Sequence, residues 1–328
     1  MQRPCHPNRK KRGRAQDTRE RLTATLTLIA AKDCPAEIWS RIFSLACVDG
    51  GYTGRSLSRV SKYIQQVSMP YKYQTLRVPE RQLRRLISTL NKMPADARCV
   101  RHLFVSSGKW EKGEVDKNKF FEGNRNRLLS LIAPSLRTLY IGSGPVNLTL
   151  PFPLPALVDL VVLCEPFGTC SHYTHSVNNM ASCYPILRRL YIGYHLYDEV
   201  PKFINALPPT VKTLRIGASY LRSISCLRSA LGLSQSEVSS PSTLDRILYE
   251  NASPTIRNPF RELAKREPRF VLVKERYCGP WYFNIRLDAA EEDKRKWLDV
   301  CAGQKDYWEP ADEEKDSKAP YNMHELGI

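Results

Sequence analysis

Five cysteine and histidine side chains lie within one short stretch of the sequence, in the residue types that metal chemistry requires. Zinc sites use Cys and His, usually with two to four residues between paired ligands. Here five residues separate the first two cysteines, and the chain contains no Cys-x-x-Cys pair. We therefore interpret the stretch as a polar loop and predict no metal site. The five residues are Cys164, Cys170, His172, His175 and Cys183.

A glycine-containing segment, GSGPVN at residues 142–147, begins like the phosphate-binding loop of a dinucleotide site. Such a loop needs a third glycine, and Asn147 occupies that position. The chain also lacks the Gly-Lys-Ser/Thr phosphate loop and the Gly-x-Ser-x-Gly nucleophile elbow. The sequence therefore predicts no catalytic residue, no cofactor-binding residue and no cofactor, and we interpret the protein as a non-enzyme.

The charge of the chain is large and unevenly distributed. Lys and Arg number 50 against 33 Asp and Glu, a formal net charge of +17 over 328 residues. Residues 1–32 contain nine basic and two acidic residues, whereas residues 288–328 contain six and twelve. A basic chain favours acidic partners: nucleic acid, an anionic membrane surface or an acidic protein segment. The longest apolar runs, such as LTLIAA and LVVLC, are too short to cross a bilayer, and we expect no membrane partner.

Cysteine usage and the N-terminal sequence indicate the compartment. The ten cysteines form no disulfide framework, and the polar, basic start lacks the apolar core of a signal peptide. We expect reduced thiols and a cytoplasmic or nuclear location. Residues 1–32 are expected to be disordered, and their basic run, NRKKRGR at 8–14, is either a nuclear-import signal or nucleic-acid arm, or a solvated tail.

A short apolar pattern recurs five times between residues 100 and 217. It has an apolar residue, two variable residues, a leucine, one variable residue and another apolar residue, as in LRTLYIG and LRRLYIG. The central leucines are 36, 21, 30 and 24 residues apart, around the 20 to 29 residues of a leucine-rich repeat. One strand and one helix per repeat predict a curved parallel stack; the alternative is an ordinary α/β domain with similar strands. The central leucines are Leu103, Leu139, Leu160, Leu190 and Leu214.

Alternation along each predicted strand assigns its side chains to two faces. Leu139 and Ile141 are expected to point toward the helices, as are their equivalents in the other repeats. The residues between them are then expected on an open face: Phe104, Tyr140, Val161, Tyr191 and Arg215.

A basic column is predicted where the strands begin. The position after each repeat's first apolar residue is basic in four of five repeats: Arg101, Arg137, Val158, Arg188 and Lys212. Equivalent positions in a parallel sheet lie about 4.8 Å apart, although the irregular intervals predict this register only between neighbouring pairs. The column is either a solvated edge or a receptor for an acidic or phosphorylated substrate segment, since arginine binds carboxylate and phosphate through two hydrogen bonds. The four basic positions, with Tyr140, Tyr191 and Arg215, are the candidate substrate-binding residues.

Residues 34–51, CPAEIWSRIFSLACVDGG, predict a short helix with a wide apolar surface. At about 100° per residue its apolar side chains span an arc of about 160°, against roughly 100° for a helix that packs one way. Pro35 suits the first turn, and Glu37 complements the positive end of the helix dipole. We expect one face to pack inward and the other, with Trp39 and Phe43, to be left for another protein. The alternative is that the repeat stack covers it.

The residues of this helix resemble an F-box. The resemblance runs through Cys34-Pro35-x-Glu37-Ile38-Trp39-x-x-Ile42-Phe43 and then Leu57-x-x-Val60-Ser61-Lys62-Tyr63. It implies a substrate-receptor subunit of an SCF-type ubiquitin ligase, acting in ubiquitin-dependent degradation. A Skp-type adaptor would bind the F-box and link it to cullin and RING subunits, and the repeat region would bind an unidentified protein substrate. The adaptor-binding residues implied are Pro35, Ile38, Trp39, Ile42, Phe43, Leu57 and Val60.

The expected fold class is therefore α+β. A small N-terminal three-helix F-box at 33–78 is followed by an irregular α/β leucine-rich-repeat-like solenoid at 79–287. An acidic tail at 288–328 follows, with a short helix near EEDKRKWLDVC. The alternative function is that of a basic nuclear nucleic-acid-binding or scaffold protein, although no recognised nucleic-acid fold is present.

Overall fold

The structure is a computed structural model, and it describes the chain in several segments. These are residues 34–106, 115–142, 150–163, 180–193, 203–204, 206–217, 227–228, 231, 233, 244–251, 257–274, 286–303 and 308. The basic N-terminal run and most of the Cys/His stretch lie outside the described residues.

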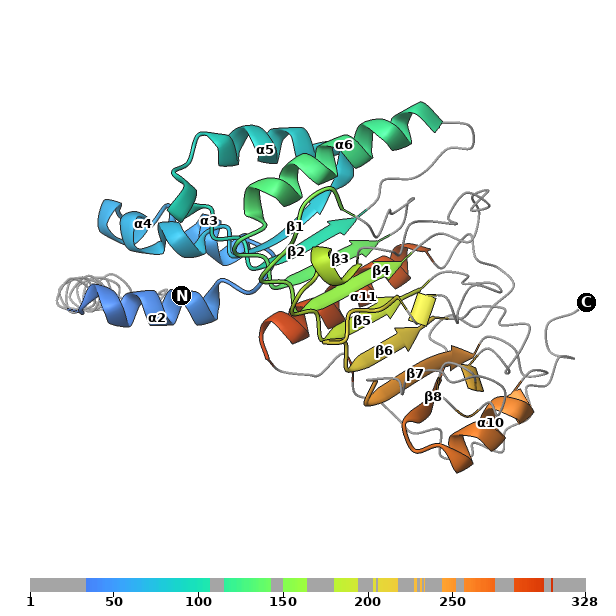
Figure 1. The fold of residues 1–328 in the computed structure, drawn as a ribbon. Coiled ribbons are helices and arrows are strands. Elements are labelled where there is room, and N and C mark those ends of the chain that lie inside the picture. Colours follow the sequence, from blue (N-terminus) through green and yellow to red (C-terminus); the bar gives the residue numbers. More distant parts are fainter. Residues whose placement is uncertain are drawn as a thin grey trace, which may run out of the picture.

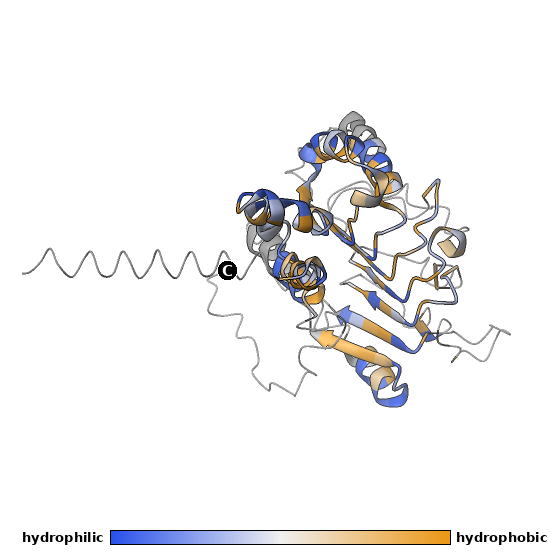
Figure 2. Ribbon diagram, turned by 90° about the vertical axis from the view of Figure 1, so that its left-hand side faces the viewer, coloured by the Kyte–Doolittle hydropathy of each residue, from blue (hydrophilic) through white to orange (hydrophobic). Residues whose placement is uncertain are grey.

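Within these segments, eight strands form one parallel sheet in which each strand pairs with the next along the chain (Figure 1). Hydrophobic residues recur along the stacked strands (Figure 2). Because sequence neighbours are also sheet neighbours, the fold grows in one direction by repetition. The strands are β1 (Thr75–Pro79), β2 (His102–Ser106), β3 (Thr138–Gly142), β4 (Asp159–Leu163), β5 (Arg189–Ile192), β6 (Thr213–Ile216), β7 (Arg246–Asn251) and β8 (Phe270–Lys274).

Helices cover both faces of the sheet and precede its first strand (Figure 1). Three short helices come first: α2 (Ala36–Ala46), α3 (Tyr52–Leu57) and α4 (Lys62–Ser68). One face of the sheet packs against α5 (Leu83–Asn91), α6 (Val115–Ile132), α7 (Met180–Cys183) and α10 (Arg257–Arg266). The other face meets α11 (Arg286–Cys301). Short 3-10 turns lie at η1 (Met69–Tyr71), η2 (Glu80–Gln82) and η3 (Ala95–Ala97).

The leucine face of the sheet forms the main core. All five central leucines of the repeats align in register across β2 to β6, and each is at most 1% exposed. Leu139 and Ile141 lie in this core, as the alternation predicted. The strands and inward positions of the repeat pattern are therefore confirmed.

The opposite face of the sheet carries an aromatic column. Phe104, Tyr140, Val161 and Tyr191 align in register and cluster with Trp297 of α11 and with Trp308. The rings of Phe104 and Tyr140 stack at 4.3 Å, and the Trp297 ring lies 5.4 Å from Phe104. The sequence correctly predicted that these side chains share one face of the sheet, but the expectation that this face is open to solvent was wrong. Helix α11 covers the rings, which would otherwise expose a large apolar area to water.

The expected α+β class is wrong. The described chain is an α/β fold built on a single parallel sheet, and a separate three-helix F-box is not shown. The first helices are joined directly to the sheet: the Gln74 side-chain amide, just before β1, donates to the carbonyl of Ser44 in α2 at 2.9 Å. Gly54 of α3 lies so close to the segment entering β1 that a Cβ there would be 2.7 Å from the Lys72 carbonyl oxygen.

Candidate protein-docking surface

Exposed large apolar side chains are concentrated in the first described helices and the turns between them. Of the eight such side chains among the described residues, six lie between residues 38 and 69. Single exposed apolar residues are ordinary on a protein surface, but a gathering of them marks a candidate interaction site. The six are Ile38, Ile42, Leu45, Tyr52, Val60 and Met69.

The inner face of α2 is aromatic and buried. Phe43 is 2% exposed and stacks on Trp39, with ring centroids 5.2 Å apart. Cys47 and Ile64 complete this small cluster, which ties α2 to α4. Burial raises the pKa of the Cys47 thiol to about 11, with Asp49 adding to the shift, so the thiol stays neutral.

The outer face of α2 is aliphatic and exposed. Ile38, Ile42 and Leu45 follow at spacings of four and three residues, which places them on one stripe. Their exposed fractions are 49%, 44% and 71%. At the start of the helix, the backbone N–H groups of Ile38 and Trp39 donate to the Pro35 carbonyl at 3.1 and 3.2 Å. The helix thus carries two apolar faces, and its own cluster covers only one of them.

The sequence predicted two apolar faces on this helix but exchanged the buried face and the partner-binding face. Trp39 and Phe43 were expected to be left for a partner, whereas Phe43 is buried and Trp39 half-buried. The aromatic rings turn inward because they remove the larger apolar area from water. Of the seven candidate adaptor-binding residues, Trp39, Phe43 and Leu57 pack in the cluster, and Pro35, Ile38, Ile42 and Val60 are exposed.

The turns beside α2 hold α3 and α4 in place. Gly50 and Gly51 adopt positive φ angles of 76° and 95°, which favour glycine. The Asp49 carboxylate accepts hydrogen bonds from the backbone N–H and hydroxyl of Thr53, at 2.8 and 2.6 Å. At the next turn the Ser61 hydroxyl accepts from the Ile64 backbone N–H at 3.1 Å, capping α4. These turns position Tyr52, the first residue of α3, and Met69, which directly follows α4 in η1; the sequence analysis missed both residues.

The basic column at the start of the strands keeps one register throughout. Backbone hydrogen bonds of 2.8 to 2.9 Å join successive positions from residue 101 to residue 212. The register therefore extends further than the neighbouring pairs predicted from the irregular intervals. Arg137, Arg188 and Lys212 are exposed, Arg101 is half-buried, and the Lys212 ammonium lies 3.8 Å from Asp245.

The basic column contributes to the electrostatic environment of its neighbour His102. His102 follows Arg101 directly, and its ring Nδ1 lies 3.2 Å from the Thr138 hydroxyl. Burial, together with the nearby positive charges of Arg101 and Arg137, lowers the pKa of His102 to about 4. The imidazole is therefore neutral near pH 7.

The other three candidate substrate-binding residues lie inside the protein. Tyr140, Tyr191 and Arg215 are 1%, 4% and 0% exposed, so they are not on the surface with the basic column. The Arg215 guanidinium pairs with Glu250, whose carboxylate also accepts from the Tyr191 hydroxyl at 2.8 Å. A buried guanidinium needs such a partner, so these residues are part of the packed interior in this structure.

The Cys/His stretch is described at one position only. Cys164, Cys170, His172 and His175 lie outside the described residues, and Cys183 is buried, with its thiol 3.3 Å from the Leu150 carbonyl. Among the described residues no group of three or more Cys, His, Asp or Glu side chains is placed to hold a metal. In the same part of the chain no helix is both long and apolar enough to cross a membrane.

Comparison with known proteins gives no assignment: no protein family and no curated protein matches the chain.

Proposed function

We propose that the chain is a substrate receptor of an SCF-type ubiquitin ligase, docking on a Skp-type adaptor through the outer face of α2. The observation that carries the proposal is the exposed stripe of Ile38, Ile42 and Leu45. Fully burying such a side chain contributes about 1.5–3 kcal/mol. Because these are already partly buried, each adds roughly half of that on docking.

The F-box resemblance of the same residues indicates a Skp-type adaptor as the protein that binds this face. Pro35, Ile38, Ile42 and Val60 belong to the quoted motif and are also exposed. The adaptor would link the chain to cullin and RING subunits, which supply the catalytic machinery. The role of this chain is then to bind the adaptor and the substrate, and the basic column would bind an acidic segment of the substrate.

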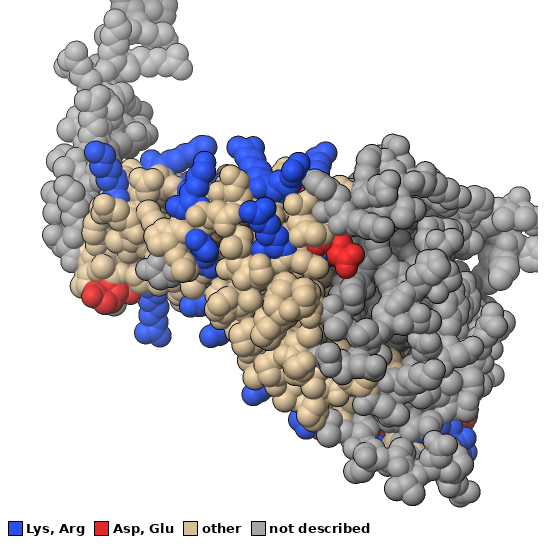
Figure 3. Space-filling view, turned by 45° about the horizontal axis from the view of Figure 1, so that its top comes forward, with Lys and Arg blue, Asp and Glu red and all other residues tan. Residues whose placement is uncertain are grey.

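A second candidate is nucleic-acid binding, favoured by the charge on another surface. Lys and Arg side chains gather over the face formed by the helices at the top of Figure 1 (Figure 3). Exposed members in η2, in α5 and directly after α5 are Arg81, Arg84, Arg85 and Lys92. Binding through such a surface falls steeply with salt, whereas docking through an aliphatic stripe changes little.

The experiment is co-purification of the full chain with the adaptor. Ile38→Glu with Ile42→Glu places two charges in the proposed interface, and we expect binding to weaken at least tenfold. Ile186→Glu is the matched control, since Ile186 is an isoleucine of the same 44% exposure as Ile42 but lies outside the first helices. If both variants bind the adaptor as tightly as the unmodified protein, the outer face of α2 is not the docking surface. If both lose binding, the interaction is non-specific.

A further inference from the structure

Helix α5 carries exposed cations on the side opposite the protein core. Its buried side packs into the main core through Leu83, Ile87 and Leu90. At about 100° per residue, Arg85 and Lys92 fall about 180° from the centre of that buried stripe, and both side chains are exposed. In η2, directly before the helix, Arg81 is exposed as well. These three cations, Arg81, Arg85 and Lys92, form the basic ridge.

The charge of the basic ridge is not balanced by the acids nearby in the sequence. Residues 51–95 contain nine Lys and Arg but a single acidic residue, Glu80. The Glu80 side chain is 4% exposed and lies 3.7 Å from Arg125 of α6, so its carboxylate faces the interior. The three ridge cations take part in no ion pair with any residue that the structure describes. Like charges along one row repel one another, and an extended anion would relieve that repulsion.

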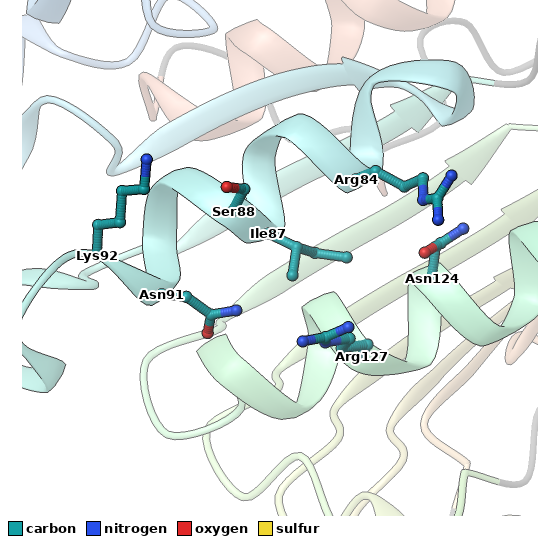
Figure 4. Close-up of a pocket in the computed structure, with 7 residues that line it drawn as sticks. All are labelled: Arg84, Ile87, Ser88, Asn91, Lys92, Asn124 and Arg127. Atoms are coloured by element: carbon teal, nitrogen blue, oxygen red, sulfur yellow. The ribbon is translucent and has the colours of Figure 1, made fainter.

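The basic ridge differs from the pocket beside it, which lies between α5 and α6 and has a volume of about 330 Å³. Figure 4 shows the Arg84 side chain turned toward Asn124 of α6, whereas the Lys92 ammonium extends away from the pocket. Arg84 therefore belongs to the contact between the two helices and is not part of the ridge. Lys92 points outward, where it can contact a ligand that lies across α5.

The surface around the ridge lacks the apolar centre of a protein-binding site. The cores of protein–protein interfaces are apolar and poor in charged residues, and Lys in particular is depleted there. None of the exposed large apolar side chains of the described residues lies in η2, α5 or the described part of α6. Helices that bind a membrane surface likewise bury apolar side chains in the bilayer. Interfaces with nucleic acid are polar and strongly positive instead, so the composition of this surface favours nucleic acid.

The length of the ridge suits a phosphodiester backbone. Arg85 and Lys92 are about 10 Å apart along the helix axis, and Arg81 extends the row by about 6 Å. One strand of a DNA duplex carries a phosphate about every 3.4 Å along the duplex axis, so a row of this length lies across several phosphates. The same elements expose neutral side chains of the kinds that contact phosphates: Gln82, Ser88 and Asn91. Residues 80–92 contain no aromatic side chain on which an unpaired base could stack, which favours a duplex over a single strand.

We propose that the basic ridge binds the phosphate backbone of a nucleic-acid duplex without reading its base sequence. Each ridge cation neutralises one phosphate and releases the counterion bound there. The proposal rests on the second candidate function above and assigns that function to one surface. It does not depend on the docking stripe of α2, so the chain can bind a duplex and the adaptor through separate surfaces.

The test is fluorescence anisotropy of a labelled DNA duplex of about 20 base pairs, titrated with the full chain at several salt concentrations. Each phosphate contact contributes about 0.9 to the slope of log affinity against log salt. The ridge variant, with Arg81→Gln, Arg85→Gln and Lys92→Gln together, should therefore lower the magnitude of that slope by about 2.7 and weaken binding at least about tenfold.

The matched control removes the same charge from three exposed cations on other parts of the chain: Arg228→Gln, Arg266→Gln and Arg295→Gln. Because charges further away than a Debye length are screened, this control should change affinity less than about twofold. Thermal unfolding of both triple variants checks that each is folded.

Further ligands identify what the ridge binds. Two DNA duplexes of unrelated sequence should bind within about twofold of each other, since phosphate contacts carry no sequence information. A DNA duplex and an RNA duplex of one sequence show which of the two the protein prefers. Tighter binding of a single strand than of the duplex, or displacement of the duplex by an equal concentration of poly-L-glutamate, would overturn the proposal in favour of a single strand or an acidic protein.

Two other results separate the site from the function. If the unmodified chain binds no duplex even at low salt, both the ridge and the second candidate function are wrong. If the two triple variants bind the duplex equally, the ridge alone is wrong, and the binding lies elsewhere on the chain. Adaptor co-purification with the ridge variant should be unchanged, so failure of this proposal stays distinguishable from failure of the docking proposal.

Discussion

Helix α2 and the central strands both carry apolar side chains on two opposite faces, but the protein covers the second face only in the sheet. Behind the leucines of the sheet, Phe104 and Tyr140 are 2% and 1% exposed because Trp297 packs against them. Behind Phe43 of α2, the side chains of Ile38, Ile42 and Leu45 remain 44–71% exposed. A second apolar face thus belongs to the core when another element of the protein packs on it, and is a candidate interface when none does.

Removing the cover of the sheet should give the largest effect. Trp297→Ala deletes a side chain that is 2% exposed, and we expect a loss of about 3–5 kcal/mol in the free energy of unfolding. Urea titration measures this loss, and binding of a hydrophobic dye should rise as the aromatic column opens. Trp297→Phe is the control: the buried indole N–H has no acceptor among the described residues, so losing it should cost less than about 1 kcal/mol. A small loss in Trp297→Ala would mean that α11 does not cover the column.

The two faces of α2 can be compared one residue apart. Phe43→Ala removes a buried ring and should also cost about 3–5 kcal/mol of stability. Ile42→Ala removes an exposed side chain and should cost less than about 1 kcal/mol while weakening adaptor binding. Denaturant unfolding and a binding titration on the same two variants give the answer. Similar stability losses in both variants would contradict the assignment of an inner and an outer face.

The pH dependence of stability should show a buried acid beside the sheet. Burial raises the pKa of Glu80 to about 7, and Arg125 offsets only part of the shift. The native state then holds a proton that the unfolded chain releases, so stability falls as pH rises from about 4.5 to 7. The loss is at most about 3 kcal/mol. Glu80→Gln should remove this slope, and a variant that keeps the wild-type slope would show that Glu80 does not cause it.

His102 should give a pH effect of the opposite sign. Its lowered pKa, about 4 in the folded protein, means that the unfolded chain binds the extra proton as pH falls from about 6.5 to 4. Stability is therefore lost on acidification, and between about pH 4.5 and 6.5 the effects of Glu80 and His102 oppose each other. The effect of His102 is therefore measured as the difference in unfolding free energy between the unmodified protein and His102→Asn at each pH. If the difference in unfolding free energy between the unmodified protein and His102→Asn is the same at pH 4 and pH 7, His102 is not buried as a neutral ring.

The sequence predicted what repetition determines and missed what long-range packing determines. Leu139 and Leu190 identified strands because their pattern recurs, and stacking predicted their parallel order, although the irregular intervals predicted the register only between neighbouring pairs. The cover over Tyr140 was not predictable from periodicity, because Trp297 is separated from it by more than 150 residues of chain. Likewise, the apolar arc of α2 could be calculated from its spacing, but only the contact with Ile64 decides which part of that arc is buried.

The pocket between α5 and α6 was missed for a related reason. Taken alone, α5 shows an amphipathic pattern with basic residues on its polar side, which is typical of a solvated surface. Arg84 and Arg127 line one pocket only because α5, α6 and η2 pack against one another. No spacing rule within one helix contains that information.

Hydrogen exchange of the full chain with and without the Skp-type adaptor tests the central claim most directly. If the outer face of α2 is the docking surface, the backbone amides of residues 36–46 should exchange more slowly in the complex, while those of β3 to β5 keep their rates. Protection in the strands with α2 unchanged, or no complex at micromolar concentrations of both proteins, would contradict the account.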